Sequence, residues 1–163
     1  MLTDGTIALR PIRADDVALL FEWRNDPENR KMFRDDRPLN FNCHCRFVER
    51  RIERGEDYWW IIEAASVPSG TISLYNFDAN RRTCEFGRFI VGREHRGQGY
   101  GRRALALVVE FARSMQVERI ACEVLSSNVQ ASGLYGSLGF AVKRVTDEGA
   151  RQFQWMEAEL IKT

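Results

Sequence analysis

Apolar residues in the first third of the chain follow a strand-like period and then a helical one. The segment Thr6 to Ile12 alternates, which predicts a first strand. Apolar positions then recur every three or four residues, so a helix is expected from Asp15 or Asp16 to Asp26, where the following proline ends it. A second helix with one apolar face is predicted from about Asn42 to Arg54.

From Tyr58 the pattern changes to the alternation of β-strands. The sequences Y-W-W-I-I-E-A, T-I-S-L-Y-N-F and T-C-E-F-G-R-F-I-V predict three strands in succession, at 58–64, 71–77 and 83–91. The V-P-S-G sequence at 67–70 and residues 79–82 are predicted as the turns that join them. The last of these strands, the fourth of the chain, leads directly into R-G-Q-G-Y-G at 96–101.

The remaining pattern alternates helices and strands. A helix with an apolar face runs to Met115, a fifth strand covers Arg119 to Leu125, and Asn128 caps a further helix that Gly139 ends. A-V-K-R-V-T and R-Q-F-Q-W-M-E-A-E-L, on either side of D-E-G-A, predict a closing hairpin. The pattern predicts a single α/β (α+β) domain over residues 1–163, with about seven strands and four helices.

Composition and charge direct attention to local sites. The chain has 24 basic and 23 acidic residues among 163, a balance that gives no general attraction to nucleic acid or to a membrane surface. It begins without a signal-peptide pattern and has no apolar run of the roughly 18 residues that span a bilayer, so a cytoplasmic location is expected. The four cysteines lack zinc-site spacing and are interpreted as free thiols; Cys43-His44-Cys45 has no second cluster to complete a metal shell, and no metal is expected.

The glycine-rich segment Arg96 to Gly101 lies between a strand and a helix. Unpaired amides and the positive end of a helix dipole meet at such a turn, and glycine lets an anion approach the backbone. The segment therefore predicts a phosphate site. Two other interpretations stay open: the first turn of a dinucleotide-binding fold, whose G-x-G-x-x-G spacing differs, and a simple turn that uses glycine for its left-handed angles.

R-G-Q-G-Y-G, followed by helix, strand and N-V-Q-A-S-G-L-Y-G-S-L-G-F, resembles the GNAT superfamily of acetyl-CoA-dependent N-acetyltransferases from Leu9 to about Leu160. The resemblance implies the GNAT fold: a mixed, mostly antiparallel sheet whose fourth and fifth strands splay apart around coenzyme A. It also implies a set of cofactor-binding residues: Ile90, Val91, Arg96, Gly97, Gln98, Gly99, Tyr100, Gly101, Arg102 (or Arg103) and Asn128.

The same resemblance suggests which residues act as general acid and general base in direct acetyl transfer to an amine. Tyr135 matches the family's frequent general acid, which protonates the thiolate of coenzyme A; its alternative role is that of a core aromatic residue. Glu123 is the first candidate for the base, acting through water, and Glu85 the second, while either glutamate is equally a surface residue. The main-chain N–H of Val91 is the candidate donor to the oxyanion.

The acceptor is sought in the amino-terminal third. Trp23-Arg24-Asn25 resembles a subgroup that acetylates nucleotide-linked amino sugars, including the pseudaminic acid pathway, and the L-R-P opening resembles ribosomal-protein α-amine acetyltransferases. Stacking on Trp23, a phosphate fork at Arg24 and an amide at Asn25 suit a nucleotide-linked 4-amino sugar, and the same residues also suit packing and helix termination.

Several other interpretations remain. The basic residues Arg30, Lys31, Arg34 and Arg37 suit a nucleotide or a solvated face, and His44 is a further acceptor-site candidate. A protein amino terminus is the second candidate acceptor; antibiotics and polyamines stay open, although an arginine-rich wall disfavours polyamines. The alternative of another class is a non-catalytic acyl-CoA-binding sensor. The sequence leaves a monomer and a homodimer equally open.

Overall fold

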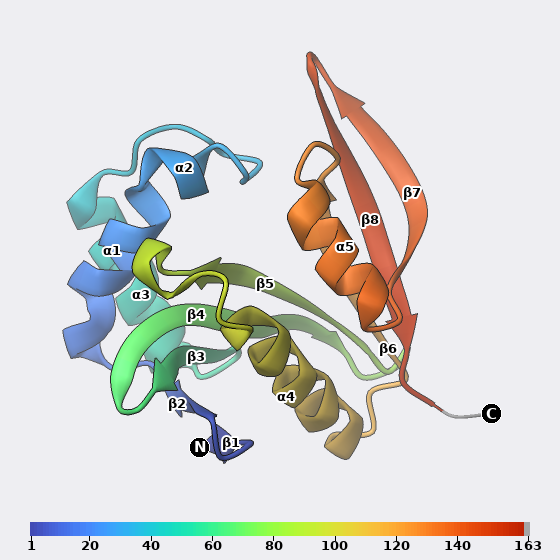
Figure 1. Cartoon of the computed structure of the whole chain (residues 1–163), viewed down its shortest axis with the longest axis horizontal. Helices are drawn as coiled ribbons and strands as arrows, with labels where there is room; N and C mark the ends of the chain where they lie inside the picture. Colours follow the sequence, from blue (N-terminus) through green and yellow to red (C-terminus); the bar gives the residue numbers. More distant parts are fainter. Residues whose placement is uncertain (162–163) are drawn as a thin grey trace.

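The computed structural model describes residues 1–161 and contains one sheet with helices on both faces (Figure 1). Its strands are β1 (Leu2–Thr3), β2 (Ile7–Pro11), β3 (Tyr58–Ala64), β4 (Val67–Asp78), β5 (Thr83–Val91), β6 (Arg119–Leu125), β7 (Ala141–Glu148) and β8 (Arg151–Glu159). Its α-helices are α1 (Val17–Asn25), α2 (Pro27–Arg30), α3 (Phe41–Arg54), α4 (Tyr100–Ser114) and α5 (Val129–Ser137). The eight strands lie in the order β1-β2-β3-β4-β5-β6-β8-β7, so the mixed α/β fold predicted from the sequence is confirmed.

Two apolar clusters hold the helices against the sheet, because successive strand residues point to opposite faces. On one face Trp59 and Ile61 of β3 pack with α1 and α3, around the fully buried Val48. On the other face Trp60 and Ile62 pack in the larger cluster with α4 and α5. The helices α1 to α3 therefore form one layer and α4 with α5 the other (Figure 1).

Neighbouring strands are antiparallel except at the centre of the sheet. There β5 and β6 run parallel, and they pair only from Thr83 to Glu85 with Arg119 to Ala121. Beyond that point each strand continues without pairing to the other, as far as Val91 and Leu125. The predicted splay of the fourth and fifth strands is therefore confirmed in β5 and β6 (Figure 1).

The predicted V-P-S-G turn is wrong. Residues 67–70 belong to β4, and the turn is the dipeptide Ala65-Ser66, whose φ angles of 49° and 64° are both positive. Two positive φ angles in a two-residue loop give the twist that an antiparallel hairpin favours. Pro68 is tolerated in β4 because it lies at a register shift of the pairing with β3, where the ladder is already interrupted.

The pattern did not predict the short elements β1 and α2. β1 pairs with β2 at the edge of the sheet. The helix α2 begins where the first helix was expected simply to end: the side chain of Asp26 accepts a hydrogen bond from the Glu28 N–H, and Pro27 occupies the first helical position, which needs no N–H donor. Within residues 1–161, every helix is too short or too polar to cross a membrane.

Candidate active site

A cavity of 530 Å³ opens where β5 and β6 separate. Its walls come from α2 and the loop after it, from β4, β5 and β6, from the glycine-rich loop, and from α5 and β8. Most of the predicted site residues line it: Ile90, Val91, Arg96, Gly97, Gly99, Tyr100, Gly101, Arg102, Glu123, Asn128 and Tyr135. Elements far apart in the sequence thus converge on one cleft.

The glycine-rich loop has the geometry of an anion cradle. Gly97 and Gly99 have φ angles of 75° and 78°, in the left-handed region that favours glycine, and a Cβ built on either would meet nothing within 4 Å. Gly99 is the N-cap of the 15-residue α4, whose first amides have no partner within the helix. Because the space beside these glycines is open and faces the cleft, a phosphate can approach the backbone there.

The third glycine serves packing instead. A Cβ at Gly101 would lie 3.3 Å from Val91 Cγ2 and 3.4 Å from Phe89 Cζ, so the absence of a side chain lets α4 begin directly against β5. Val91 and Phe89 both line the cleft. The loop and the strand are therefore held at a fixed distance.

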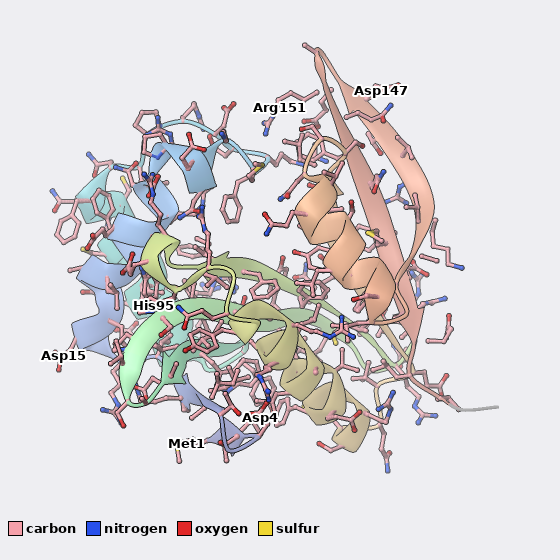
Figure 2. All side chains as sticks on the ribbon, in the orientation of Figure 1. Met1, Asp4, Asp15, His95, Asp147 and Arg151 are labelled. Atoms are coloured by element: carbon pink, nitrogen blue, oxygen red, sulfur yellow. The ribbon has the colours of Figure 1, made fainter. Side chains whose placement is uncertain are left out.

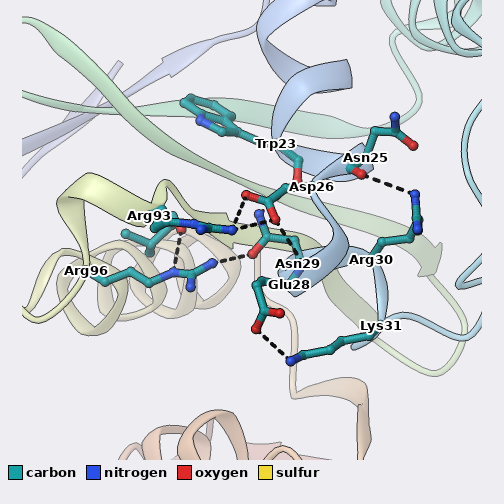
Figure 3. A network of polar contacts seen from close by, with 10 residues as sticks. Trp23, Asn25, Asp26, Glu28, Asn29, Arg30, Lys31, Arg93 and Arg96 are labelled. Carbon is teal, nitrogen blue, oxygen red and sulfur yellow. Dashed lines mark hydrogen bonds and ion pairs between the residues drawn. The ribbon is translucent and has the colours of Figure 1, made fainter.

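Arg96 connects the glycine-rich loop to α2. Its Nε donates to the Val91 carbonyl over 3.2 Å and its Nη2 donates to Asn29 Oδ1, while Asn29 Nδ2 donates to the Trp23 carbonyl over 2.8 Å (Figure 3). Arg93 adds an ion pair to Asp26 over 3.0 Å. These contacts tie the start of the loop to the amino-terminal helices (Figure 3).

The side chains of the other polar residues in this segment point to different partners. Arg102 lines the cleft and donates to Ser137 Oγ of α5, whereas Arg103 forms an ion pair with Asp4 over 2.7 Å. The side chain of Gln98 lies outside the cleft lining and accepts a hydrogen bond from the Tyr100 hydroxyl over 2.9 Å. Of the two arginines that the sequence offered for a further phosphate, Arg102 is therefore the one in place.

The strand β5 carries a bulge beside the cleft. Thr71 pairs with Ile90 but Ser73 pairs with Gly87, so β5 has an extra residue, and Arg88 there has a φ angle of 47°. The Arg88 guanidinium lies 4.7 Å from the Trp59 ring and forms a 3.0 Å ion pair with Asp57. Burial lowers the pKa of Arg88, but Asp57 opposes that effect, so the bulge is anchored by a charged pair.

Tyr135 is buried in α5 with its ring among aromatic residues. Its ring meets that of Phe86 edge-on at 5.0 Å and stacks with that of Phe89 at 6.3 Å. Burial raises the pKa of Tyr135 well above the ordinary value of 10. The phenol is therefore protonated throughout the neutral range.

The two candidate bases lie in different places. Glu123 lines the cleft, where Arg34 Nε and Nη2 donate to its two carboxylate oxygens over 2.8 and 2.5 Å. Glu85 belongs to a separate hollow of 280 Å³ with Asp78 and Trp155, and it accepts a hydrogen bond from Asn76 over 3.1 Å. Only Glu123 is brought together with Tyr135 in the cleft lining.

The tripeptide Trp23-Arg24-Asn25 lies outside the cleft lining. Trp23 is buried, and its indole Nε1 lies 3.2 Å from a Cβ built on Gly92, just before the glycine-rich loop. Arg24 stacks on Phe33 at 3.9 Å and donates to the Asp35 carbonyl, and Asn25 accepts from the Leu39 N–H over 2.8 Å. These contacts give the tripeptide packing partners outside the cleft lining, and its contact with the acceptor stays a prediction.

The other candidates near the amino terminus are also engaged in local contacts. Lys31 pairs with Glu28 and Arg37 pairs with Asp35. His44 is buried against Phe21, at 5.7 Å between rings, and lies outside the cleft lining. Within residues 1–161, no three His, Cys, Asp or Glu side chains are grouped as metal ligands.

Sequence reasoning missed several residues of the cleft: Asn29, Phe33, Tyr75, Arg88, Phe89, Gln130 and Phe153. Arg34 was noted only as part of a basic cluster. One available signal was Gly87 in the middle of a strand, since an internal strand glycine often marks a close approach. The Tyr75 hydroxyl lies 2.2 Å from a Cβ built there, so Gly87 is what lets Tyr75 reach the cleft.

Comparisons with known proteins agree with this geometry. The profile of the acetyltransferase (GNAT) domain matches residues 6–141. The chain is 27% identical over 160 residues to an uncharacterized protein of Methanocaldococcus jannaschii, covering 94% of this chain and 31% of that protein. It is 27% identical over 150 residues to the probable N-acetyltransferase YjcK of Bacillus subtilis, covering 86% of this chain and 83% of that protein.

A solved structure gives the same result for the fold. The spermidine N-acetyltransferase of Vibrio cholerae in complex with CoA and spermine superposes with a TM-score of 0.87 at 17% identity, covering 96% of this chain and 97% of that one. The chain spans 31%, 21% and 37% of the lengths of the first three curated relatives that it matches.

Proposed function

This chain belongs to the GNAT family of acetyltransferases, and we propose that it transfers the acetyl group of acetyl-CoA to the nitrogen of a small primary amine. The observation that carries the proposal is the divergence of β5 and β6 after Glu85 and Ala121, directly beside the open backbone of Gly97 and Gly99. A long, thin ligand with a phosphate-bearing end fits a gap between strands that leads to an anion cradle.

The residues present suit the acetyl donor of this family, acetyl-CoA. Gly97, Gly99 and the first amides of α4 would hold its pyrophosphate, with Arg102 beside them. The exposed edge of β5 at Ile90 and Val91 would bind the pantetheine arm, and a main-chain N–H there is our candidate donor to the oxyanion. When bound, acetyl-CoA supplies the acetyl group and a thiol leaving group that needs a proton.

Two side chains of the cleft are proposed to handle protons. Tyr135 lines the cleft with its hydroxyl protonated in the neutral range, and it is our candidate donor to the leaving thiolate. Glu123 is our candidate acceptor for the proton of the amine, since it alone of the two glutamates lines the cleft with Tyr135.

The acceptor is assigned only as a small primary amine. The nucleotide-linked amino sugar expected from the sequence depended on Trp23, Arg24 and Asn25, which lie behind the cleft. The Vibrio cholerae structure is named for spermidine, and polyamines belong among the amines to test. The cleft wall itself mixes charges, with Glu28 and Glu123 beside Arg34 and Arg88.

The experiment is thiol release from acetyl-CoA across polyamines, simple diamines, nucleotide-linked 4-amino sugars and peptides with free amino termini. Mass spectrometry then identifies the acetylated product. Turnover confined to small amines supports the proposal, whereas turnover confined to peptides would replace it by acetylation of protein amino termini. Tight acetyl-CoA binding without turnover of any amine would indicate an acyl-CoA sensor.

A further inference from the structure

The guanidinium of Arg34 lies in the cleft between two carboxylates. It donates to both oxygens of Glu123, over 2.8 and 2.5 Å, and to Glu148 at the end of β7. It also lies over the ring of Phe153, 4.5 Å from its centroid. Arg34, Glu123 and Phe153 all line the cleft, so a cation of the chain occupies the surroundings of the candidate base.

The backbone that carries Arg34 is fixed from outside the cleft. Arg151 of β8 donates to the carbonyls of Lys31, Phe33 and Arg34 over 2.9, 2.7 and 3.0 Å. These bonds hold the segment after α2 against β8 without using the Arg34 side chain. The guanidinium is therefore free to exchange its contacts while the main chain stays in place.

The contacts of the guanidinium are individually weak. The side chains of Arg34, Glu123 and Glu148 are 41%, 37% and 49% exposed. Ion pairs exposed to this degree contribute little each, because water screens them and ordering long side chains costs entropy. A ligand cation that offers the same interactions can therefore displace Arg34.

The pairing also blocks the chemistry proposed for Glu123. The guanidinium fills the lone pair on each Glu123 oxygen that faces it, so an amine proton has no position on that side of the carboxylate while Arg34 stays there. An acceptor ammonium would make the same contacts as Arg34, a charge-assisted hydrogen bond to Glu123 and a cation–π contact with Phe153.

We propose that Arg34 occupies the position of the acceptor's ammonium group, and that a cationic acceptor must displace it before Glu123 can accept a proton. On displacement the ammonium gives one proton to the Glu123 carboxylate, directly or through water, and becomes the neutral amine. The proton leaves to solvent after the reaction, and Arg34 pairs with Glu123 again. Arg34 is thus a residue that determines specificity for cationic amines, a conclusion that rests on the proposed function.

The test compares Arg34→Gln, which removes the charge and keeps a polar side chain, with Arg37→Gln as the matched control. Arg37 is 82% exposed, pairs with Asp35 and lies outside the cleft lining. Three quantities are measured: the KM and kcat for the best amine of the panel, and the Kd of 1,4-diaminobutane for the CoA-loaded protein by calorimetry. Thermal unfolding of each variant checks that the fold is intact.

We expect Arg34→Gln to lower both KM and Kd by about threefold to tenfold, the effect of removing one or two exposed ion pairs. Arg37→Gln should leave both unchanged. Unchanged or higher values in Arg34→Gln would overturn the inference and make Arg34 a strut that closes the cleft. If neither wild type nor Arg34→Gln acetylates any amine, the proposed function fails. The Kd of the diamine then still shows whether Arg34 competes with a cation.

Discussion

The hydroxyl of Tyr135 is the single group on which proton donation is proposed to depend. Tyr135→Phe removes that oxygen and keeps the ring among Phe86 and Phe89. We expect kcat to fall by about tenfold to a thousandfold, in the range of general-acid contributions, with the Kd of acetyl-CoA unchanged. Steady-state kinetics and calorimetry measure the two effects.

Tyr58→Phe is the control for this substitution, since Tyr58 is exposed and stacks on Trp60, outside the cleft lining. Equal kcat values for wild type and Tyr135→Phe would remove Tyr135 from the mechanism and leave it as a core aromatic residue.

Gly87 and Tyr75 are packed so closely that one additional carbon atom at Gly87 would overlap the Tyr75 side chain. A Cβ at Gly87 would lie 2.2 Å from the Tyr75 hydroxyl, and 3.0 Å from the nearest ring carbons. We expect Gly87→Ala to lower the free energy of unfolding by about 1 to 3 kcal/mol, as overpacking does. In a Tyr75→Phe background the cost should be smaller, which a double-mutant cycle in urea measures. An identical cost in both backgrounds would contradict the contact.

At the scale of elements, the caps of α3 and α5 allow a matched comparison. Asn40 accepts a hydrogen bond from the Cys43 N–H over 3.0 Å, and Asn128 accepts one from the Ala131 N–H over 3.2 Å. Either asparagine changed to alanine should cost about 1 kcal/mol of unfolding free energy, the usual value of an N-cap.

Only one of these caps borders the cleft. Asn128 lines it and Asn40 does not. Calorimetry should therefore show weaker acetyl-CoA binding for Asn128→Ala and an unchanged Kd for Asn40→Ala. Weakening of equal size in both variants would mean that lost stability, and not the position of α5, affects the cofactor.

Local sequence rules predicted most elements and failed where one signal has two meanings. Asp26-Pro27 was correctly interpreted as the stop of α1, but an aspartate before a proline is also a good helix start, and α2, which begins there, was missed. The turn at Ala65-Ser66 lacks the glycine or asparagine that positive φ angles favour, so V-P-S-G attracted the prediction instead.

Site residues that lie in contiguous motifs were predicted from the sequence, whereas contacts between distant residues were not. The loop at 96–101 and the N-V-Q-A-S-G-L-Y segment were found because their residues are close in sequence. The pairing of Arg34 with Glu123 joins residues 89 positions apart, in a loop and a strand that meet only through the fold. No period or spacing could have indicated it.

For the whole molecule, one ionic cluster joins the amino-terminal helices to the sheet. Arg10 of β2 pairs with Asp16, just before α1, over 2.9 Å, and with Glu63 of β3 over 2.8 Å, and the side chains of Arg10 and Asp16 are only 13% and 10% exposed. Burial alone would raise the pKa of Asp16, but the hydrogen bonds from Arg10 and Arg13 outweigh it, so the pKa is lowered.

Because the pKa of Asp16 is lower in the folded protein than its unfolded value of 3.8, ionised Asp16 stabilises the fold at pH values above 3.8. This contribution to stability is lost as the pH falls below 3.8 toward the folded-state pKa. We expect Asp16→Asn to lower the free energy of unfolding by about 3 kcal/mol at pH 7, because one partner of a buried ion pair is removed. The difference in unfolding free energy between wild type and Asp16→Asn should become smaller as the pH falls through about 4. Asp15→Asn is the control, because Asp15 is exposed at the molecular surface (Figure 2). A difference independent of pH would contradict the ionic account.

The most direct test of the proposed function follows a labelled acetyl group from acetyl-CoA while thiol release is counted in the same reaction. The account predicts that the label appears on the nitrogen of a small primary amine, with one amide formed for each thiol released. Thiol release without an acetylated amine, or tight acetyl-CoA binding without release, would contradict it.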